Sequence, residues 1–236
     1  MRRSLTLTLT ICLFSPFTYA DKDAPGWHGE GEFGLAITSG NSDTENLHGR
    51  LKLTNNTDLW RYTLGLEALF VSDSNATTAE RYTFGYKADR KISADNYLFG
   101  AFRYDDDRFS GFDFQSSLTA GYGRRLFKYS RSRLDVEAGA GYRFSETVDG
   151  ASQNQVIGRF YGDYEYTVSD NALFSQTLLI EPGSDNTFTE SVTAFKVGSA
   201  KKLALKLSLT ARNNSNTPTG TVSTDTISTA SVVYSF

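Results

Sequence analysis

The dominant pattern in this chain is a series of short segments in which apolar and polar residues alternate. From Gly26 to the C-terminus there are twelve such segments of about ten residues, separated by turns rich in Gly, Asn, Asp and Ser. In the clearest one, residues 133–144, apolar side chains take every even position and Arg, Asp, Glu and Gly take the odd positions. A period of two indicates β-strands with one apolar and one polar face. The pattern therefore predicts an all-β chain of about twelve strands.

Two regularities favour a closed antiparallel transmembrane β-barrel over a soluble sandwich. The connections alternate roughly between tight turns and longer polar loops, as the two ends of such barrels do. Aromatic residues also gather near strand ends, where membrane-interface girdles form, whereas a sandwich needs no such banding. Examples of these aromatic residues are Trp27, Trp60, Phe70, Tyr82, Tyr142 and Phe144. We therefore predict a single barrel domain over residues 26–236.

The N-terminus has the features of a secretory signal. Arg2 and Arg3 are followed by a short apolar stretch, and Thr18 and Ala20 place small residues where a signal peptidase reads. We expect residues 1–20 to be removed and residues 21–25 to form a short periplasmic lead. The only cysteine, Cys12, lies in the signal, so the exported chain has no disulfide.

The last strand ends on an aromatic pair two residues apart, Tyr234 and Phe236. This ending resembles the closing strand of bacterial outer-membrane barrels, in which the terminal motif is read by the assembly machinery. The resemblance implies that Tyr234 and Phe236 form the assembly signal. It also implies that the barrel assembly machinery is a partner.

Composition narrows the class of partner. The net charge of −3 becomes −5 once Arg2 and Arg3 leave with the signal, which argues against nucleic-acid binding. The mean hydropathy of −0.37 is compatible with a membrane location, because a barrel strand is apolar on only one face. We expect the apolar face to contact membrane lipid and lipopolysaccharide in the cell outer membrane.

The polar faces of the strands carry charges of both signs. Such charges are very costly in lipid, so we expect them to line a polar lumen. They could form a conduit whose field selects ions, or they could pair with one another and fill the interior. The mixture of signs favours a narrow or occluded lumen. The predicted lining residues are Glu30, Glu32, Arg50, Arg61, Glu67, Arg81, Asp89, Arg133, Asp135, Glu137, Arg143, Arg159, Asp163 and Glu165.

The sequence contains no recognisable catalytic set. The only histidines, His28 and His48, both fall on the inward face, whereas a lipid hydrolase needs its nucleophile and base at the membrane boundary. The acidic run Asp105–Asp107 lacks the spacing of a calcium loop, so we interpret it as a solvated loop. We therefore expect no catalysed reaction, no metal and no cofactor.

Two segments have weak patterns. Residues 96–104 are apolar on both faces, and we place Arg103 inward; residues 187–198 alternate poorly and suggest a bulge. In the segment that begins at Phe112 we expect Phe112 on the apolar face and Asp113 on the polar one.

Three stretches resemble one known family. They are GEFGLAITSGNSDT (residues 31–44), DRFSGFD (residues 107–113) and LTAGYG (residues 118–123). The chain is similar to the family of salt-induced outer-membrane proteins, a domain family of unknown function. The resemblance implies an outer-membrane barrel of a Gram-negative cell and brings no catalytic or ligand-binding residues. We expect a passive barrel with a narrow solute or ion pathway; the alternatives are an enzyme acting on envelope lipid and a surface-interaction barrel.

Overall fold

The computed structural model describes residues 23–39, 45–71, 79–107, 110–200, 202–218 and 221–236. The predicted signal, residues 1–20, and Asp21 and Lys22 of the lead lie outside this part of the chain. No helix in the described residues is long and apolar enough to cross a membrane. The twelve strands are β1 (Gly26–Ser39), β2 (Glu45–Asn56), β3 (Trp60–Val71), β4 (Ala79–Lys91), β5 (Asn96–Asp107), β6 (Phe112–Lys128), β7 (Ser132–Thr147), β8 (Ser152–Ser169), β9 (Ala172–Glu181), β10 (Phe188–Ala200), β11 (Leu203–Asn214) and β12 (Thr224–Ser235).

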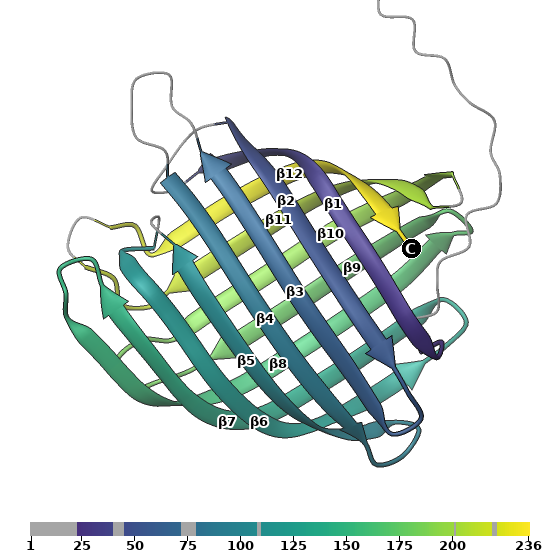
Figure 1. Ribbon diagram of the computed structural model, residues 1–236, viewed down its shortest axis with the longest axis horizontal. Coiled ribbons are helices and arrows are strands. Elements are labelled where there is room, and N and C mark those ends of the chain that lie inside the picture. Colours follow the sequence, from purple (N-terminus) through teal and green to yellow (C-terminus); the bar gives the residue numbers. More distant parts are fainter. Residues whose placement is uncertain (1–22, 40–44, 72–78, 108–109, 201, 219–220) are drawn as a thin grey trace, which may run out of the picture.

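The strands form a closed antiparallel ring in which each strand pairs with its neighbours in sequence (Figure 1). The ring closes where β1 pairs with β12, in a register that sets Glu30 opposite Ser235 and Phe33 opposite Val232. Beyond the last strand, the backbone N–H of Gly29 donates to the Phe236 carbonyl at 2.8 Å. Closure leaves no unpaired sheet edge, which a membrane-spanning sheet requires. The predicted all-β, closed twelve-stranded barrel is confirmed.

The outer face of the ring is apolar. Phe33 and Leu207 are each 63% exposed, and aromatic rings pair along the exterior, as Phe70 does with Tyr82 and Tyr142 with Phe144. Large apolar side chains are exposed on every strand, whereas soluble monomers rarely expose large contiguous apolar surfaces. The outer face therefore matches a surface solvated by lipid.

The two ends of the barrel differ in their connections. At one end, which we call the turn end, two to four residues join consecutive strands; at the other, the loop end, four to nine residues do. The N-terminal lead and Phe236 lie at the turn end. Short turns face the periplasm and longer loops face the exterior in barrels of this type.

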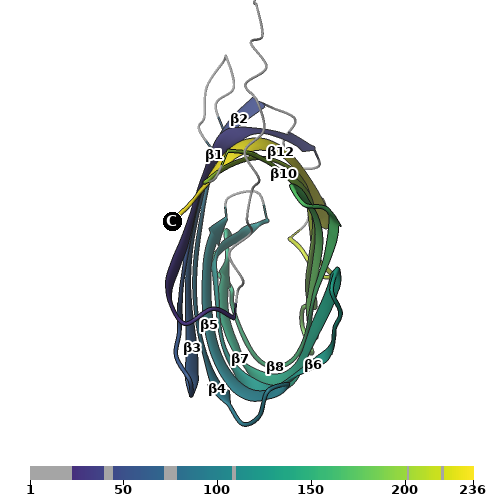
Figure 2. The ribbon, with the colours of Figure 1, turned by 90° about the vertical axis from the view of Figure 1, so that its right-hand side faces the viewer.

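The ring is flattened into an oval, with β1 and β12 near one narrow end and β6 to β8 near the other (Figure 2). Inward-facing glycines occupy the two bends. A Cβ on Gly139 would lie 2.4 Å from the Ala120 carbonyl oxygen, and one on Gly34 would lie 2.3 Å from that of Ala230. Gly85, which faces inward on a flat wall, has no atom this close. Because adjacent strands turn sharply at the bends, only glycine fits there.

The strand register shows which way side chains point in the segments whose alternation is weak. In β5, Tyr97 and Phe99 face inward with Arg103, which agrees with the inward placement of Arg103. The predicted bulge in β10 lies between Gly198 and Ala200. The expectation for Phe112 was wrong: a register shift between Phe112 and Phe114 turns Phe112 inward, where it is buried, and exposes Asp113.

Gly139→Ala is expected to lower the free energy of unfolding by about 1–3 kcal/mol, because the added methyl forces β6 and β7 apart at the bend. Urea unfolding of the barrel in detergent measures the change. Gly85→Ala is the control, since it adds the same methyl to an inward position with open space. Equal unfolding midpoints for the two variants would contradict the role of the bend.

Candidate functional site

The candidate site is the barrel interior, where charged side chains from opposite walls meet near the loop end. The central contact joins Arg103 on β5 to Glu190 on β10, with guanidinium-to-carboxylate distances of 2.8 and 3.0 Å. Arg212 on β11 lies 3.4 Å from Asp105 on β5, although these two strands stand six positions apart in the ring of twelve. The walls therefore lie within side-chain reach of each other at this level.

We call this group the loop-end cluster, and its carboxylates each contact more than one arginine. Glu190 also contacts the Arg212 Nε at 2.7 Å, and Asp105 also contacts the Arg103 Nε at 2.5 Å. Buried charges are tolerated when they are paired in this way. The cluster has six members: Arg81, Arg103, Asp105, Asp107, Glu190 and Arg212.

Two members of the cluster correct the sequence interpretation. Asp105 and Asp107 were expected in a solvated loop, but both belong to β5, face inward and are only 9% and 5% exposed. Arg81 pairs with Asp107 at 2.5 Å. Asp107 shares the inward parity of Arg103, so continuing the alternation by four residues would have revealed this.

A layer of amides lies beside the loop-end cluster. Asn186, in the connection between β9 and β10, is buried and donates to the Asn214 Oδ1 at 2.8 Å; Gln115 on β6 reaches the same oxygen at 3.3 Å. The Gln155 Oε1 accepts from the Asp185 backbone N–H at 2.8 Å. This connection therefore folds over the lumen and hydrogen-bonds to the walls, an arrangement that its turn-like sequence did not indicate.

A ladder of alternating charges runs from this layer toward the turn end. Arg143 on β7 pairs with Glu181 on β9 at 2.8 Å, and Arg159 on β8 pairs with Glu181 at 3.2 Å and with Glu137 at 3.5 Å. Glu137 also contacts Lys87 on β4. The last steps are Lys87–Asp89 at 2.9 Å and Arg61–Asp89 at 2.7 Å. Opposite charges thus line much of the interior in direct contact.

The opposite side of the lumen, near β1, carries a second set of pairs. Glu32 contacts Lys206 at 2.7 Å and accepts a hydrogen bond from the Ser231 hydroxyl at 2.6 Å, while Glu30 contacts Lys196 at 2.6 Å. His48 is buried with its Nε2 3.2 Å from Glu67. These pairs join side chains on the inward faces of the strands, and some of the strands that they join are not neighbours in the sheet.

At the turn end, Asp23 of the lead lies inside the barrel mouth. Its carboxylate contacts Arg125 through two nitrogens, each at 3.0 Å, Lys128 at 2.9 Å and Arg133 at 3.4 Å. Burial raises the pKa of Asp23, but the Lys128 hydrogen bond and the charges of Arg133 and Arg125 outweigh it and hold that pKa well below its usual range.

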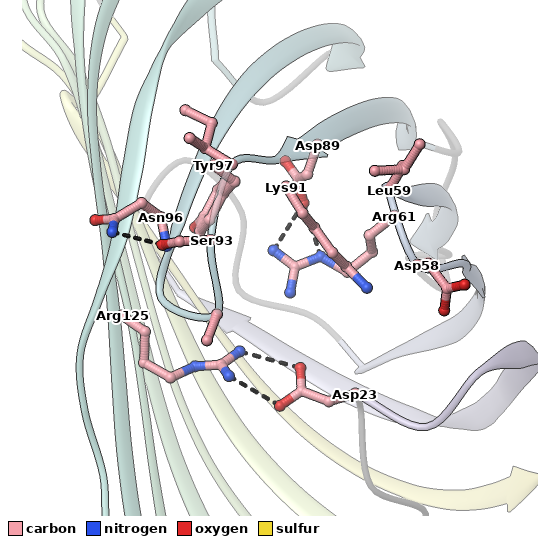
Figure 3. Close-up of a pocket in the computed structure, with 12 residues that line it drawn as sticks. Asp23, Asp58, Leu59, Arg61, Asp89, Lys91, Ser93, Asn96, Tyr97 and Arg125 are labelled. Atoms are coloured by element: carbon pink, nitrogen blue, oxygen red, sulfur yellow. Dashed lines mark hydrogen bonds and ion pairs between the residues drawn. The ribbon is translucent and has the colours of Figure 1, made fainter.

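A cavity of about 370 Å³ opens beside this contact (Figure 3). Asp23 and Arg125 face each other on one side of it, and Arg61 and Asp89 lie on another. Tyr97 from β5 and the turn residue Asp58 also line this cavity.

The predicted lining residues are distributed over these groups, and their functional role stays a prediction. Most are placed above; Arg50 lies 3.9 Å from Glu67, and Arg133 contacts Asp135. Asp163 and Glu165 are half-buried on the inward face of β8, opposite Asp135 and Arg133 in the register. Arg103, placed inward from the sequence, faces the lumen as expected. Further inward charges among the described residues, outside the predicted lining set, include Asp23, Lys87, Asp105, Asp107, Arg125, Glu181, Glu190, Lys196, Lys206 and Arg212.

The two residues of the predicted assembly signal lie on the outer face. Tyr234 and Phe236 are 47% and 54% exposed, and their rings stack with centroids 6.0 Å apart. The Phe236 ring covers Gly29, on which a Cβ would lie 2.3 Å from it. Recognition by the assembly machinery stays a prediction.

A closed ring of strands with an apolar outer face and a charged interior defines an outer-membrane β-barrel, and the chain resides in the outer membrane. A family model described as "Protein of unknown function, DUF481" matches residues 31–236, so the chain belongs to that family. This confirms the family predicted from the sequence motifs. Induction by salt stays a prediction.

One curated relative is the uncharacterized protein YdiY of Escherichia coli K12, 29% identical over 227 residues that cover 94% of this chain and 89% of YdiY. Solved structures share the fold at low identity. The NanC porin superposes with a TM-score of 0.58 at 9% identity, covering 86% of this chain and 98% of NanC. The translocator domain of the autotransporter NalP from Neisseria meningitidis gives 0.53 at 12% identity, covering 92% and 90%. The KdgM porin gives 0.50 at 10% identity, covering 88% and 99%.

Arg143→Met is expected to lower the free energy of unfolding by about 3 kcal/mol, because it leaves the buried Glu181 carboxylate with a single cationic partner. The substitution also removes hydrogen bonds to the carbonyls of Asn186 and Glu181. Urea unfolding measures the loss, with Arg90→Met as the control because Arg90 is exposed. An unfolding midpoint equal to that of the control would contradict a structural role for the ladder.

Proposed function

We propose that the protein is a passive outer-membrane barrel whose lumen is a narrow pathway for water and small ions, closed to larger solutes by the loop-end cluster. The observation that carries the proposal is the contact between opposite walls, Arg103 with Glu190 and Arg212 with Asp105. A solute that enters from the loop end meets the folded connection between β9 and β10 and these four side chains before it reaches the charge ladder.

Charge pairing also favours small ions over uncharged solutes. Each carboxylate in the cluster contacts two arginines, so a group that gives up one contact to a passing ion keeps another. A larger solute would have to separate several pairs at once. The proposed pathway is therefore narrow in size and weak in its preference for one sign of charge.

The inward positions of the histidines support a role without catalysis. His48 contacts Glu67, and the His28 Nε2 lies 2.8 Å from the Ala24 carbonyl oxygen, so both rings are held away from the lipid boundary. An enzyme acting on envelope lipid would need a nucleophile and a base at that boundary. The connections at the loop end, four to nine residues long, offer little surface for adhesion.

The export and assembly steps belong to the same proposal. Residues 1–20 act as the signal, residues 21–25 remain as the lead, and residues 26–236 form the barrel. The exposed aromatic pair of Tyr234 and Phe236 is the surface that the barrel assembly machinery would read.

Arg103→Ala combined with Arg212→Ala is expected to raise single-channel conductance severalfold and to make the current cation-selective. The two truncations open the constriction and remove the arginine partners of Asp105 and Glu190, while Asp107 keeps its contact with Arg81. Asp105→Ala combined with Glu190→Ala should reverse the preference toward anions. Planar bilayer recording with salts of different ion size measures both effects.

The matched control is Arg90→Ala combined with Arg131→Ala, which removes two exposed arginines and should leave the current unchanged. Each variant is first tested for folding by heat-dependent mobility in detergent gels. Large conductance steps in the unmodified protein would overturn the constriction. Identical ion preferences in the two double variants would overturn the role of the cluster.

A further inference from the structure

The turn end holds a set of positive charges whose arrangement the pathway does not explain. Arg125 and Lys128 close β6, Arg133 opens β7, and the short connection between the strands brings all three to one point of the barrel mouth. Asp135 is the wall carboxylate among them, contacting Arg125 at 3.0 Å and also Arg133. Asp135 therefore contacts two of the three cations, and Asp163 and Glu165 face the lumen from β8 opposite Asp135 and Arg133 in the register.

The Asp23 carboxylate contacts all three cations. Arg125 holds both of its oxygens in a two-pronged contact, while Lys128 and Arg133 each approach one oxygen. Planar, two-pronged contact with a guanidinium is the geometry by which arginine recognises carboxylates. Asp23 thus occupies the cluster as a carboxylate ligand would.

Asp23 is delivered to the cluster by a segment that is not a barrel strand. On the β2 side of the mouth, the Asn56 side-chain amide donates to the Asp23 carbonyl at 2.6 Å and to the Ala24 carbonyl at 3.3 Å. From there the lead reaches β6, four positions away in the ring. The described contacts of Asp23 and Ala24 are with side chains of the barrel, so releasing these contacts breaks no pairing between strands.

The cavity of about 370 Å³ beside Asp23 gives a ligand room to extend beyond its carboxylate. Arg125 and Asp23 both line it, so a molecule bound to Arg125 in place of Asp23 would project into this space (Figure 3). Arg61 and Tyr97 line the same space and offer further polar contacts.

We propose that Arg125, Lys128 and Arg133 form a binding site for the carboxylate group of a small organic anion, and that Asp23 occupies this site in competition with the ligand. The two-pronged Arg125 contact selects a flat two-oxygen group, and the adjacent cavity accommodates a molecule of several carbon atoms. This binding is an equilibrium property of the turn end and does not depend on the conduction proposed for the loop end.

Isothermal titration calorimetry with glutarate, at low ionic strength, tests the site in protein purified from outer membranes after export. Asp23→Ala is expected to bind glutarate at least tenfold more tightly than the unmodified protein. The reason is that a tethered competitor acts at an effective concentration in the millimolar range or higher. Glutaramide, which has the same carbon chain without charge, should not bind.

Asp58→Ala is the matched control, because Asp58 lines the same cavity and is exposed without contacting the three cations in the described structure. It should bind glutarate as weakly as the unmodified protein does. Adding Arg125→Ala and Arg133→Ala to Asp23→Ala should abolish binding. Circular dichroism and gel mobility confirm that each variant is folded.

Three results would overturn the proposal. The first is that folded Asp23→Ala protein does not bind glutarate, and the second is that Asp58→Ala protein binds it as tightly as Asp23→Ala protein does. Binding of inorganic phosphate but not of glutarate would reject the carboxylate class. None of these results depends on bilayer current, so the proposed loop-end pathway is tested independently of the proposed binding site.

Discussion

The interior of this barrel depends on how close its two long walls lie to each other. A round ring of twelve strands would hold opposite charges apart and leave each to water, whereas the oval brings β5 within ion-pair reach of β10 and β11. The contact with Asp105 across the lumen then gives the Arg212 side chain, 6% exposed, a charged partner in place of water. The flattened shape of the ring and the pairing of the charges inside it therefore depend on each other.

The oval in turn depends on positions without side chains. Gly121, Gly139 and Gly141 lie where β6 and β7 bend, and Gly34 lies at the opposite bend beside Ser231. A Cβ at any of them would meet backbone atoms of the adjacent strand at under 3 Å, so a larger residue would open the bend. Glycine at the bends and charge on the flat walls thus support each other.

Much of the fold could be predicted from alternation alone. The lipid outside and the polar lumen inside impose opposite demands on successive residues, so the parity of Leu134 and Arg133 identifies their faces. The partners of those charges could not be predicted in the same way. Arg212 and Asp105 are separated by more than a hundred residues, and their contact depends on the flattening rather than on any local pattern.

Local departures from the alternation of apolar and polar residues explain the placements that the sequence analysis predicted wrongly or did not predict. Phe112 faces inward because a register shift at the start of β6 breaks the alternation, and no residue type at that point signals it. Asp105 and Asp107 were mistaken for a loop because three consecutive aspartates look solvated, although their parity continues that of Arg103. Asp23 and Asn186 lie outside the strands, where alternation carries no information.

The distribution of partners also distinguishes the two ends of the lumen. At the loop end, the residues that pair with Arg103 and Arg212 belong to strands, so separating these pairs means moving the wall or its side chains. At the turn end, one partner of Arg125, Lys128 and Arg133 belongs to the lead, which is joined to the barrel by one chain connection and a few hydrogen bonds. Replacing the charged partner of a lumen side chain costs the least free energy where that partner can move without disturbing the sheet. The turn end is therefore where the proposed ligand would replace a protein group with the barrel still closed, whereas the proposed passage at the loop end would be limited by pairs fixed in the wall.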